Sequence, residues 1–176
     1  MKKVIILSVF LTATVFAQTQ QTNPLKIGYV DSEIILAQYP EAIKAKSDLE
    51  AMVSKWRKEA DSMAADLQNA YAEYQKQAQT MTQEKQREAQ QKIIEKEQKL
   101  QQYREQKFAQ PNGEYFVKQE QLMTPVKQKI FKAIEDIAKE EGMNFVLDKA
   151  GDVVVLYADP SFDITFKVLD RLKRGK

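Results

Sequence analysis

The chain has 176 residues, a formal net charge of +2, five glycines, and neither cysteine nor histidine. Missing both residue types, it has no means for disulfide or thiol chemistry or cysteine-ligated metal, and it lacks the commonest general base of enzymes. Its 27 basic and 25 acidic residues nearly balance, whereas a nucleic-acid-binding domain normally carries a basic surplus. We therefore predict no metal site, no cofactor and no nucleic-acid partner.

Residues 1–17 are typical of a cleavable secretory signal peptide. Lys2 and Lys3 precede the apolar residues 4–15, and Val15-Phe16-Ala17 offers a cleavage site before Gln18. The apolar stretch is well short of the roughly 20 residues that span a membrane, and an uncleaved anchor is the alternative. We expect a secreted mature chain that begins with a polar linker, residues 18–24. Its net charge is about zero, because Lys2 and Lys3 leave with the signal.

Residues 25–40 are predicted to form the first part of a compact body. Residues 26–30 have the composition of a β-strand. Asp31 or Ser32 can cap a short helix over residues 33–38, which Tyr39 and Pro40 end. Pro40 can then open the next helix.

Residues 41–124 are predicted to form a long helical hairpin. No glycine or proline occurs between residues 41 and 79, and most residues there are good helix formers. Apolar residues recur at alternating spacings of four and three, as in a coiled coil. This seam consists of Leu49, Val53, Trp56, Ala60, Met63, Leu67, Ala70 and Tyr74.

Two segments compete as the point where this hairpin reverses. Pro111-Asn112-Gly113 is the strongest local breaker, but reversal there would give arms of about 70 and 28 residues that cannot pair along their length. Reversal at residues 80–82 gives nearly matched arms of about 39 and 42 residues. We therefore predict a tip near residues 79–82 and a break at residues 111–113 in the return arm.

Residues 125–176 are predicted to complete the body. Thr124 and Pro125 have the pattern of an N-cap and first residue of a helix that ends at Gly142. Strands over residues 144–147 and 153–157 are expected to form a hairpin, and Asp163 can cap a last helix over residues 164–173. The predicted fold is α+β. It combines a small three-stranded antiparallel β unit and short helices with a long antiparallel coiled-coil hairpin.

Both faces of the predicted β unit carry apolar residues, so both should be covered. The body has only about 68 residues, and a domain of that size is marginal alone. We infer an obligate homo-oligomer whose number of copies the residues do not fix. The residues expected in its shared β core are Ile27, Tyr29, Phe145, Leu147, Val153 and Val155.

The body segments carry a resemblance to a known family. They are KIGYVDSEIILAQYPE at 26–41, LMTPV at 122–126, AIEDIAKEEGMNFVLD at 133–148 and GDVVVLY at 151–157. With the signal peptide and the long hairpin, the chain resembles the Skp/OmpH periplasmic chaperones over nearly all of its mature length. The resemblance implies a periplasmic homotrimer with a shared β-barrel and three tentacle-like arms around a cavity. It also implies that the cavity holds unfolded outer-membrane proteins and prevents their aggregation without ATP.

A holdase needs scattered, adaptable apolar contacts, because its clients share no sequence. The candidate client-binding residues are the large apolar side chains of the polar arms: Tyr71, Met81, Tyr103, Phe108, Tyr115 and Phe116. The alternative is that such residues only pack the arms together. This alternative is favoured for Trp56, Met63 and Tyr74, which lie on the heptad seam.

Other functions are also compatible with parts of the sequence. A coiled-coil spacer or adaptor of the cell envelope would share the hairpin and the oligomer but not the chaperone activity. An enzyme is not predicted, because carboxylates such as Asp31, Glu33 and Asp148 are not joined by a nucleophile, base and oxyanion donor. A membrane-surface protein is disfavoured since the helices lack a basic polar face, although peripheral contact with the membrane or lipopolysaccharide stays open.

Overall fold

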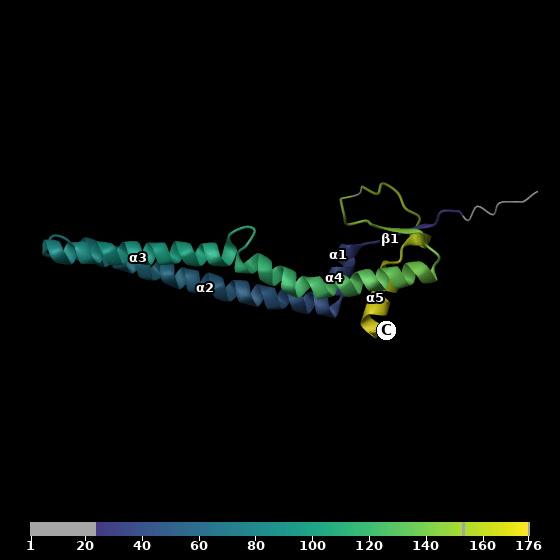
Figure 1. Cartoon of the computed structure of the whole chain (residues 1–176), viewed down its shortest axis with the longest axis horizontal. Coiled ribbons are helices and arrows are strands. Elements are labelled where there is room, and N and C mark those ends of the chain that lie inside the picture. Colours follow the sequence, from purple (N-terminus) through teal and green to yellow (C-terminus); the bar gives the residue numbers. More distant parts are fainter. Residues whose placement is uncertain (1–23, 153, 176) are drawn as a thin grey trace, which may run out of the picture.

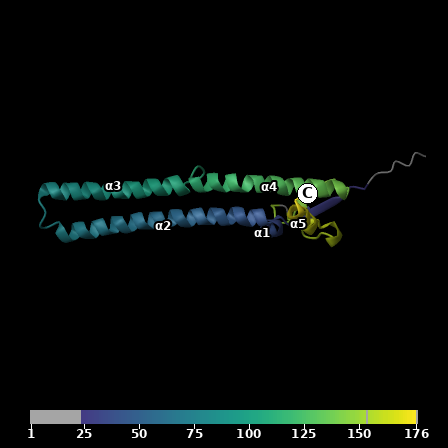
Figure 2. The ribbon, with the colours of Figure 1, turned by 90° about the horizontal axis from the view of Figure 1, so that it is seen from below.

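The computed structural model describes residues 24–152 and 154–175, which form a compact base and a long arm (Figure 1). The arm consists of two helical rods that lie side by side and join at the far end (Figure 2). The predicted signal peptide, most of the predicted linker and Val153 lie outside the described residues.

The base begins with strand β1, Ile27–Val30, and helix α1, Ser32–Gln38. The Asp31 carboxylate caps α1 by accepting a hydrogen bond from the Ile34 N–H at 3.0 Å. Tyr39 has an extended backbone, and α2 starts at once with Pro40 as its first residue. Proline suits this position, because it has no N–H and the N–H of the first helical residue has no partner within the helix.

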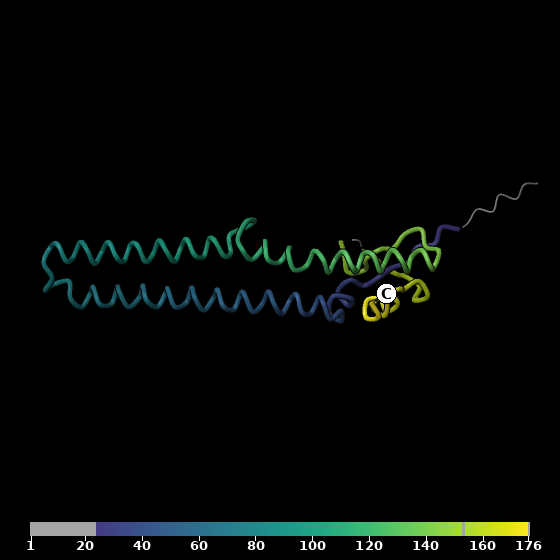
Figure 3. Tube along the Cα trace, turned by 60° about the horizontal axis from the view of Figure 1, so that its bottom comes forward, coloured from purple at the N-terminus to yellow at the C-terminus, as the bar shows by residue number. Residues whose placement is uncertain are grey.

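The outgoing rod of the arm is helix α2, Pro40–Gln77. The return rod consists of two helices, α3, Gln83–Phe108, and α4, Glu114–Glu140. The 38 residues of α2 extend about 57 Å. The chain reverses between α2 and α3, where the Thr82 hydroxyl caps α3 by accepting from the Lys85 N–H at 3.4 Å. Residues 109–113 interrupt the return arm and protrude as a loop between α3 and α4 (Figure 3).

The predicted helix start at Thr124 and Pro125 is wrong, because α4 runs through both residues without interruption. Proline removes one helical hydrogen bond and normally breaks a helix interior. Here tertiary packing outweighs that local signal. Val126 and Ile130 just after the proline are buried, and Leu122 just before it packs against the same core.

Within the described residues the sheet has two strands, which are parallel rather than antiparallel as predicted. Strand β2, Phe145–Asp148, pairs with β1 so that Ile27 lies opposite Phe145 and Tyr29 opposite Leu147. The long arm is the crossover that two parallel strands require. An isolated parallel bridge between Tyr29 and Asp163 lies on the other side of β1.

The predicted β-hairpin after β2 does not form in the described residues. Residues 154–158 are not a strand, and Leu156 is 94% exposed. Hairpin turns that match strand twist place at least one residue at positive φ. Within the described part of the chain, positive φ occurs only at Gly142 and Gly175, so the turn at residues 149–152 lacks that conformation. The β-prone composition of residues 154–157 is therefore insufficient to form a third strand.

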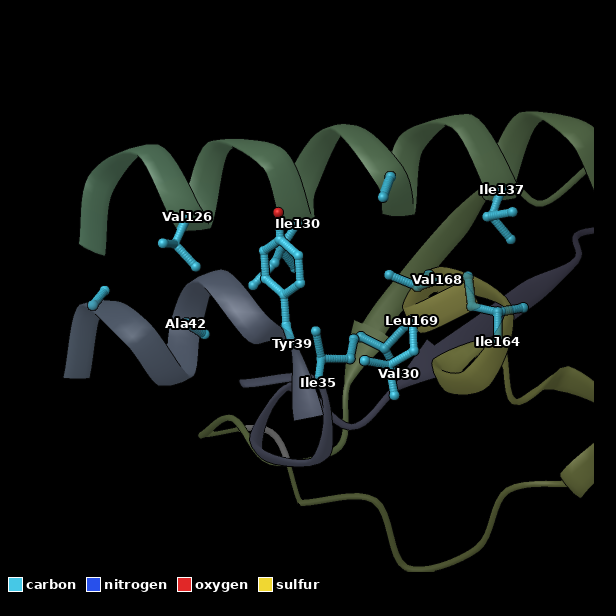
Figure 4. Close-up of a cluster of buried hydrophobic side chains, with 12 residues drawn as sticks. Val30, Ile35, Tyr39, Ala42, Val126, Ile130, Ile137, Ile164, Val168 and Leu169 are labelled. Atoms are coloured by element: carbon cyan, nitrogen blue, oxygen red, sulfur yellow. The ribbon is translucent and has the colours of Figure 1, made fainter. Parts of the chain in front are cut away.

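The core lies where α1, the root of α2, α4 and the last helix, α5, Thr165–Arg174, converge (Figure 4). A short 3₁₀ turn, η1, Pro160–Phe162, leads into α5. Apolar residues from every one of these helices and from β1 meet in one cluster. Its members are Val30, Ile35, Tyr39, Ala42, Ala45, Val126, Ile130, Ala133, Ile137, Ile164, Val168 and Leu169.

The Ile35 side chain should be a sensitive test of this core, because none of its surface is exposed. We expect Ile35→Ala to lower the free energy of unfolding by about 2–5 kcal/mol through lost burial and the cavity left behind. Urea unfolding followed by circular dichroism measures this change. Ile94→Ala, at an exposed position of α3, should change it by less than about 0.5 kcal/mol. Equal effects would contradict the core described above.

A second test concerns Asp148, which joins β2 to α1. Burial raises the pKa of its carboxyl, but hydrogen bonds from Ser32 (3.1 Å) and Ala150 (3.0 Å) outweigh burial and lower the pKa below its ordinary value. This contribution to stability should be complete above about pH 4 and lost as pH falls through the lowered pKa. Asp148→Asn should therefore unfold with a weaker acid dependence than the wild type, while Asp152→Asn, in the exposed part of the same turn, should not.

Candidate functional site

The arm is held together by a narrow apolar seam. All eight seam residues predicted on α2 are buried or half-buried, and Trp56 and Ala60 are the most deeply buried of those beyond the base. On α3 only Ile93 and Leu100 are fully buried. Most of the remaining surface of the arm is polar, with isolated exposed apolar residues such as Tyr71 and Ile94, so its two rods share much less apolar contact than the helices of the base.

The best-packed point of the arm is a cluster around Trp56, the only tryptophan of the chain. Phe108, at the end of α3, meets the Trp56 ring edge-on at a centroid distance of 6.1 Å. The Lys107 ammonium lies 5.2 Å from the Trp56 centroid and 5.5 Å from that of Tyr103. Lys107 also forms an ion pair of 2.5 Å with Glu114, the first residue of α4. This ion pair connects α3 to α4 across the break.

The Tyr103 hydroxyl donates a hydrogen bond to the Glu59 carboxylate across the arm. Burial, the hydrogen bond to Glu59 and the nearby carboxylate charges raise the pKa of Tyr103 to about 12. The phenol therefore stays protonated, and stays a donor, at any physiological pH. Beyond this point polar contacts add to the thin apolar seam around Ile93, as where the Gln90 amide donates to the Tyr74 hydroxyl at 2.6 Å.

The predicted client-binding residues fall into three groups. Tyr103 and Phe108 belong to the Trp56 cluster, so their rings are occupied by packing within the arm. Tyr115 and Phe116 form a T-shaped pair at the start of α4, with centroids 5.0 Å apart. Tyr71, 43% exposed, and Met81, half-buried at the tip, stand apart from both groups.

Lys107 is the arm residue whose role the sequence did not indicate. On α3 it follows the buried Leu100 by seven residues, where a heptad repeat would place another apolar side chain, so its charge suggests a gap in the packing. The structure instead places its ammonium over an aromatic ring and beside a carboxylate, two partners that stabilise a cation. The available signal was the presence of Trp56 on the facing helix, at a seam position.

A second candidate surface lies on the base. Ile27, Phe145 and Leu147 project from the same face of the sheet and are 43%, 59% and 38% exposed, whereas Tyr29 beside them is buried. The opposite face, with Val30 and Val146, packs on the core. The prediction that both faces are covered therefore holds for only one face within a single chain. Val155, predicted for the same β core, is half-buried outside any strand.

Two of the three carboxylates considered for catalysis have structural partners. Asp31 caps α1, and Asp148 accepts hydrogen bonds from the Ser32 and Ala150 backbone. Across residues 24–152 and 154–175, no group of three or more acidic side chains is arranged to hold a metal ion. In the same residues, none of the helices combines the length and apolar character needed to cross a membrane.

Comparison with known proteins places the chain in a family. The model of the family described as outer membrane protein (OmpH-like) matches residues 26–172, which include β1, the whole arm and most of α5. The chain belongs to the OmpH-like family. A search of curated protein sequences gave no match.

The OmpH-like fold is also found in a solved structure. The crystal structure of an OmpH-like protein from Caulobacter crescentus CB15, which is proposed to be an outer membrane chaperone, matches with a TM-score of 0.73. The match covers 86% of each chain at 15% sequence identity. At that identity the likeness concerns the fold, and it extends over both the base and the arm.

The hydrogen bond from Tyr103 to Glu59 predicts that this OmpH-like arm loses stability at alkaline pH. Because the pKa of Tyr103 is raised to about 12 from an ordinary value near 10, its contribution to stability should be complete below about pH 10. It should then be lost as pH rises to about 12. Urea unfolding followed by Trp56 fluorescence should reveal this decline, and Tyr103→Phe should weaken it. Tyr71→Phe, which lies outside the cluster, should behave like the wild type.

Proposed function

We propose that this OmpH-like protein is an ATP-independent periplasmic holdase that binds unfolded outer-membrane proteins between its arms and prevents their aggregation. The observation that carries the proposal is a long, thinly packed helical hairpin with apolar side chains such as Tyr71 and Met81 at its surface. Such a surface suits clients that share no sequence, because it offers adaptable contacts without a fixed pocket. Family membership and the fold it shares with a proposed chaperone support the same role.

We further propose that copies of the chain assemble through the exposed face of the sheet, as the trimer that the family resemblance implies. Ile27, Phe145 and Leu147 leave an apolar surface open to water, and residues 154–157 add Val154, Leu156 and Tyr157. An exposed apolar surface of this kind marks an interaction site. Assembly would surround a common space with several arms, which is the geometry that holding a whole unfolded protein requires.

The central test is aggregation of a client. Light scattering should be recorded when a urea-denatured outer-membrane β-barrel protein is diluted into buffer without nucleotide, with and without the mature protein at about one assembled particle per client. We expect the mature protein to suppress scattering and to form a complex that survives size exclusion. A folded oligomer that leaves scattering unchanged would instead support a spacer or adaptor of the cell envelope.

The apolar side chains that are exposed or half-buried at the arm surface should carry a measurable part of this binding. We expect the triple variant Tyr71→Ser, Met81→Ser, Phe116→Ser to weaken client affinity about tenfold, since it removes apolar area available to a client. The matched control changes three exposed glutamines of the arm, Gln68→Ser, Gln79→Ser and Gln128→Ser. Equal client affinities of the two triple variants and the wild type would exclude these side chains from binding.

A further inference from the structure

A groove runs along the root of the arm and is distinct from the Trp56 cluster. It has a volume of about 1150 Å³ and lies between α1, the first half of α2 and the start of α4. One wall is the face of α2 from Ile43 to Lys58, a length of about 22 Å. The other wall is a row on α4, Tyr115, Gln119 and Met123, spaced four residues apart so that all three share one face.

The break at residues 109–113 accounts for the position of this groove. Because α4 is a new helix that begins at Glu114, the face that it turns toward α2 need not continue the face that α3 turns toward α2. Phe108 and Lys107 fill the seam against Trp56 on the α3 side of the break. On the other side, the first turns of α4 leave an open channel beside α2. The interruption therefore separates a closed seam from an open groove.

The groove is lined by apolar side chains along its length, with Lys46 and Glu50 midway along the α2 wall and further charges toward its ends. Leu36, Leu49, Val53 and Met123 contribute apolar side chains, of which Leu49 is buried. Arg57 and Lys58 lie at the end nearer the break, and Glu33 lies at the α1 end. Within the described residues none of these three charges has an ion-pair partner within 4 Å.

We propose that this groove binds an extended segment of an unfolded outer-membrane β-barrel protein, with apolar side chains on alternate residues and its acidic end against Arg57 and Lys58. Strands of such barrels alternate apolar and polar residues over about 10 residues. An extended chain rises about 3.3 Å per residue, so about seven residues fit the groove. The apolar face would contact the groove, while the polar face and the backbone stay in water. The inference rests on the proposed function and identifies the groove as a site where the client contacts the protein.

The test uses the assembled mature protein and two fluorescein-labelled peptides of 10 residues. Both alternate valine with serine or threonine. One ends in two aspartates and the other in two lysines. Fluorescence anisotropy measures their affinities. The salt concentration is 0.15 M, because charges more than about 8 Å apart are then largely screened and only nearby charges affect binding. The variant is Arg57→Glu, Lys58→Glu. The control, Lys92→Glu, Lys99→Glu, makes the same charge change at exposed positions of α3 outside the groove.

We expect the groove variant to bind the aspartate-ended peptide about tenfold more weakly and the lysine-ended peptide more tightly. The control should retain the preference of the wild type. Val53→Ser combined with Met123→Ser should weaken both peptides, because it removes apolar contact without changing charge. Unchanged affinities in both groove variants would overturn the assignment.

Two further measurements separate this inference from its alternatives. Sedimentation should give the same assembled mass for the wild type and Arg57→Glu, Lys58→Glu. A changed mass would identify the groove as a contact between copies and overturn the proposal. The client-aggregation assay tests the holdase function independently. A wild-type protein that suppresses aggregation while its groove variants bind both peptides normally would retain the proposed function and lose only this site.

Discussion

The structure depends on the burial of apolar side chains from the two ends of the described chain in a single core. Val30 and Ile35 come from the first elements, whereas Ile164 and Val168 come from the last, and all four pack with the apolar stripe of α4. The arm is therefore an insertion between two halves of one small body. Because neither half contains enough apolar surface to form a core of its own, the arm has a fixed root only when both halves are in place.

Stability must decrease along the arm from this root to the tip. The base has a continuous apolar core, the middle of the arm has the Trp56 cluster, and the outer part has half-buried seam residues and exposed hydrogen bonds. At the tip, the Gln86 side chain donates to the Ala78 carbonyl at 2.6 Å, a contact that water can replace. Regions with few buried contacts and solvent-exposed hydrogen bonds open at low free-energy cost. An arm with a rigid root and adaptable outer walls suits the holding of clients of different sizes.

The parts of this fold that a sequence can predict are those whose cause is local. The heptad spacing around Trp56 indicates a long helix because it repeats through many turns, and Asp31 and Thr82 have the residue type and position of helix caps. The prediction failed where distant contacts decide. Pro125 lies inside α4 because a core built from other elements stabilises both sides of it. Residues 154–158 form no strand, since a run of β-prone residues does not by itself supply a partner edge.

The candidate site was predictable to the same extent. Composition alone identified Tyr71 and Met81 as large apolar residues in a polar arm, but it could not separate them from Tyr103 and Phe108, which the fold uses for packing. That distinction depends on which residues face one another across two antiparallel helices. The groove at the root of the arm was equally hidden, because it requires the break to place Tyr115 and Met123 opposite α2.

The parallel pairing of β1 with β2 also determines the order in which the molecule can be made. Lys26 and Asn144, which flank the paired strands, are 118 residues apart. Whether the chain emerges from the ribosome or from an export channel, β1 therefore emerges well before its partner and stays unpaired until then. The arm helices can form during that time, because their contacts are local. Until β2 emerges, the unpaired strand is protected from aggregation only by its four-residue length and by the flanking charges of Lys26 and Asp31.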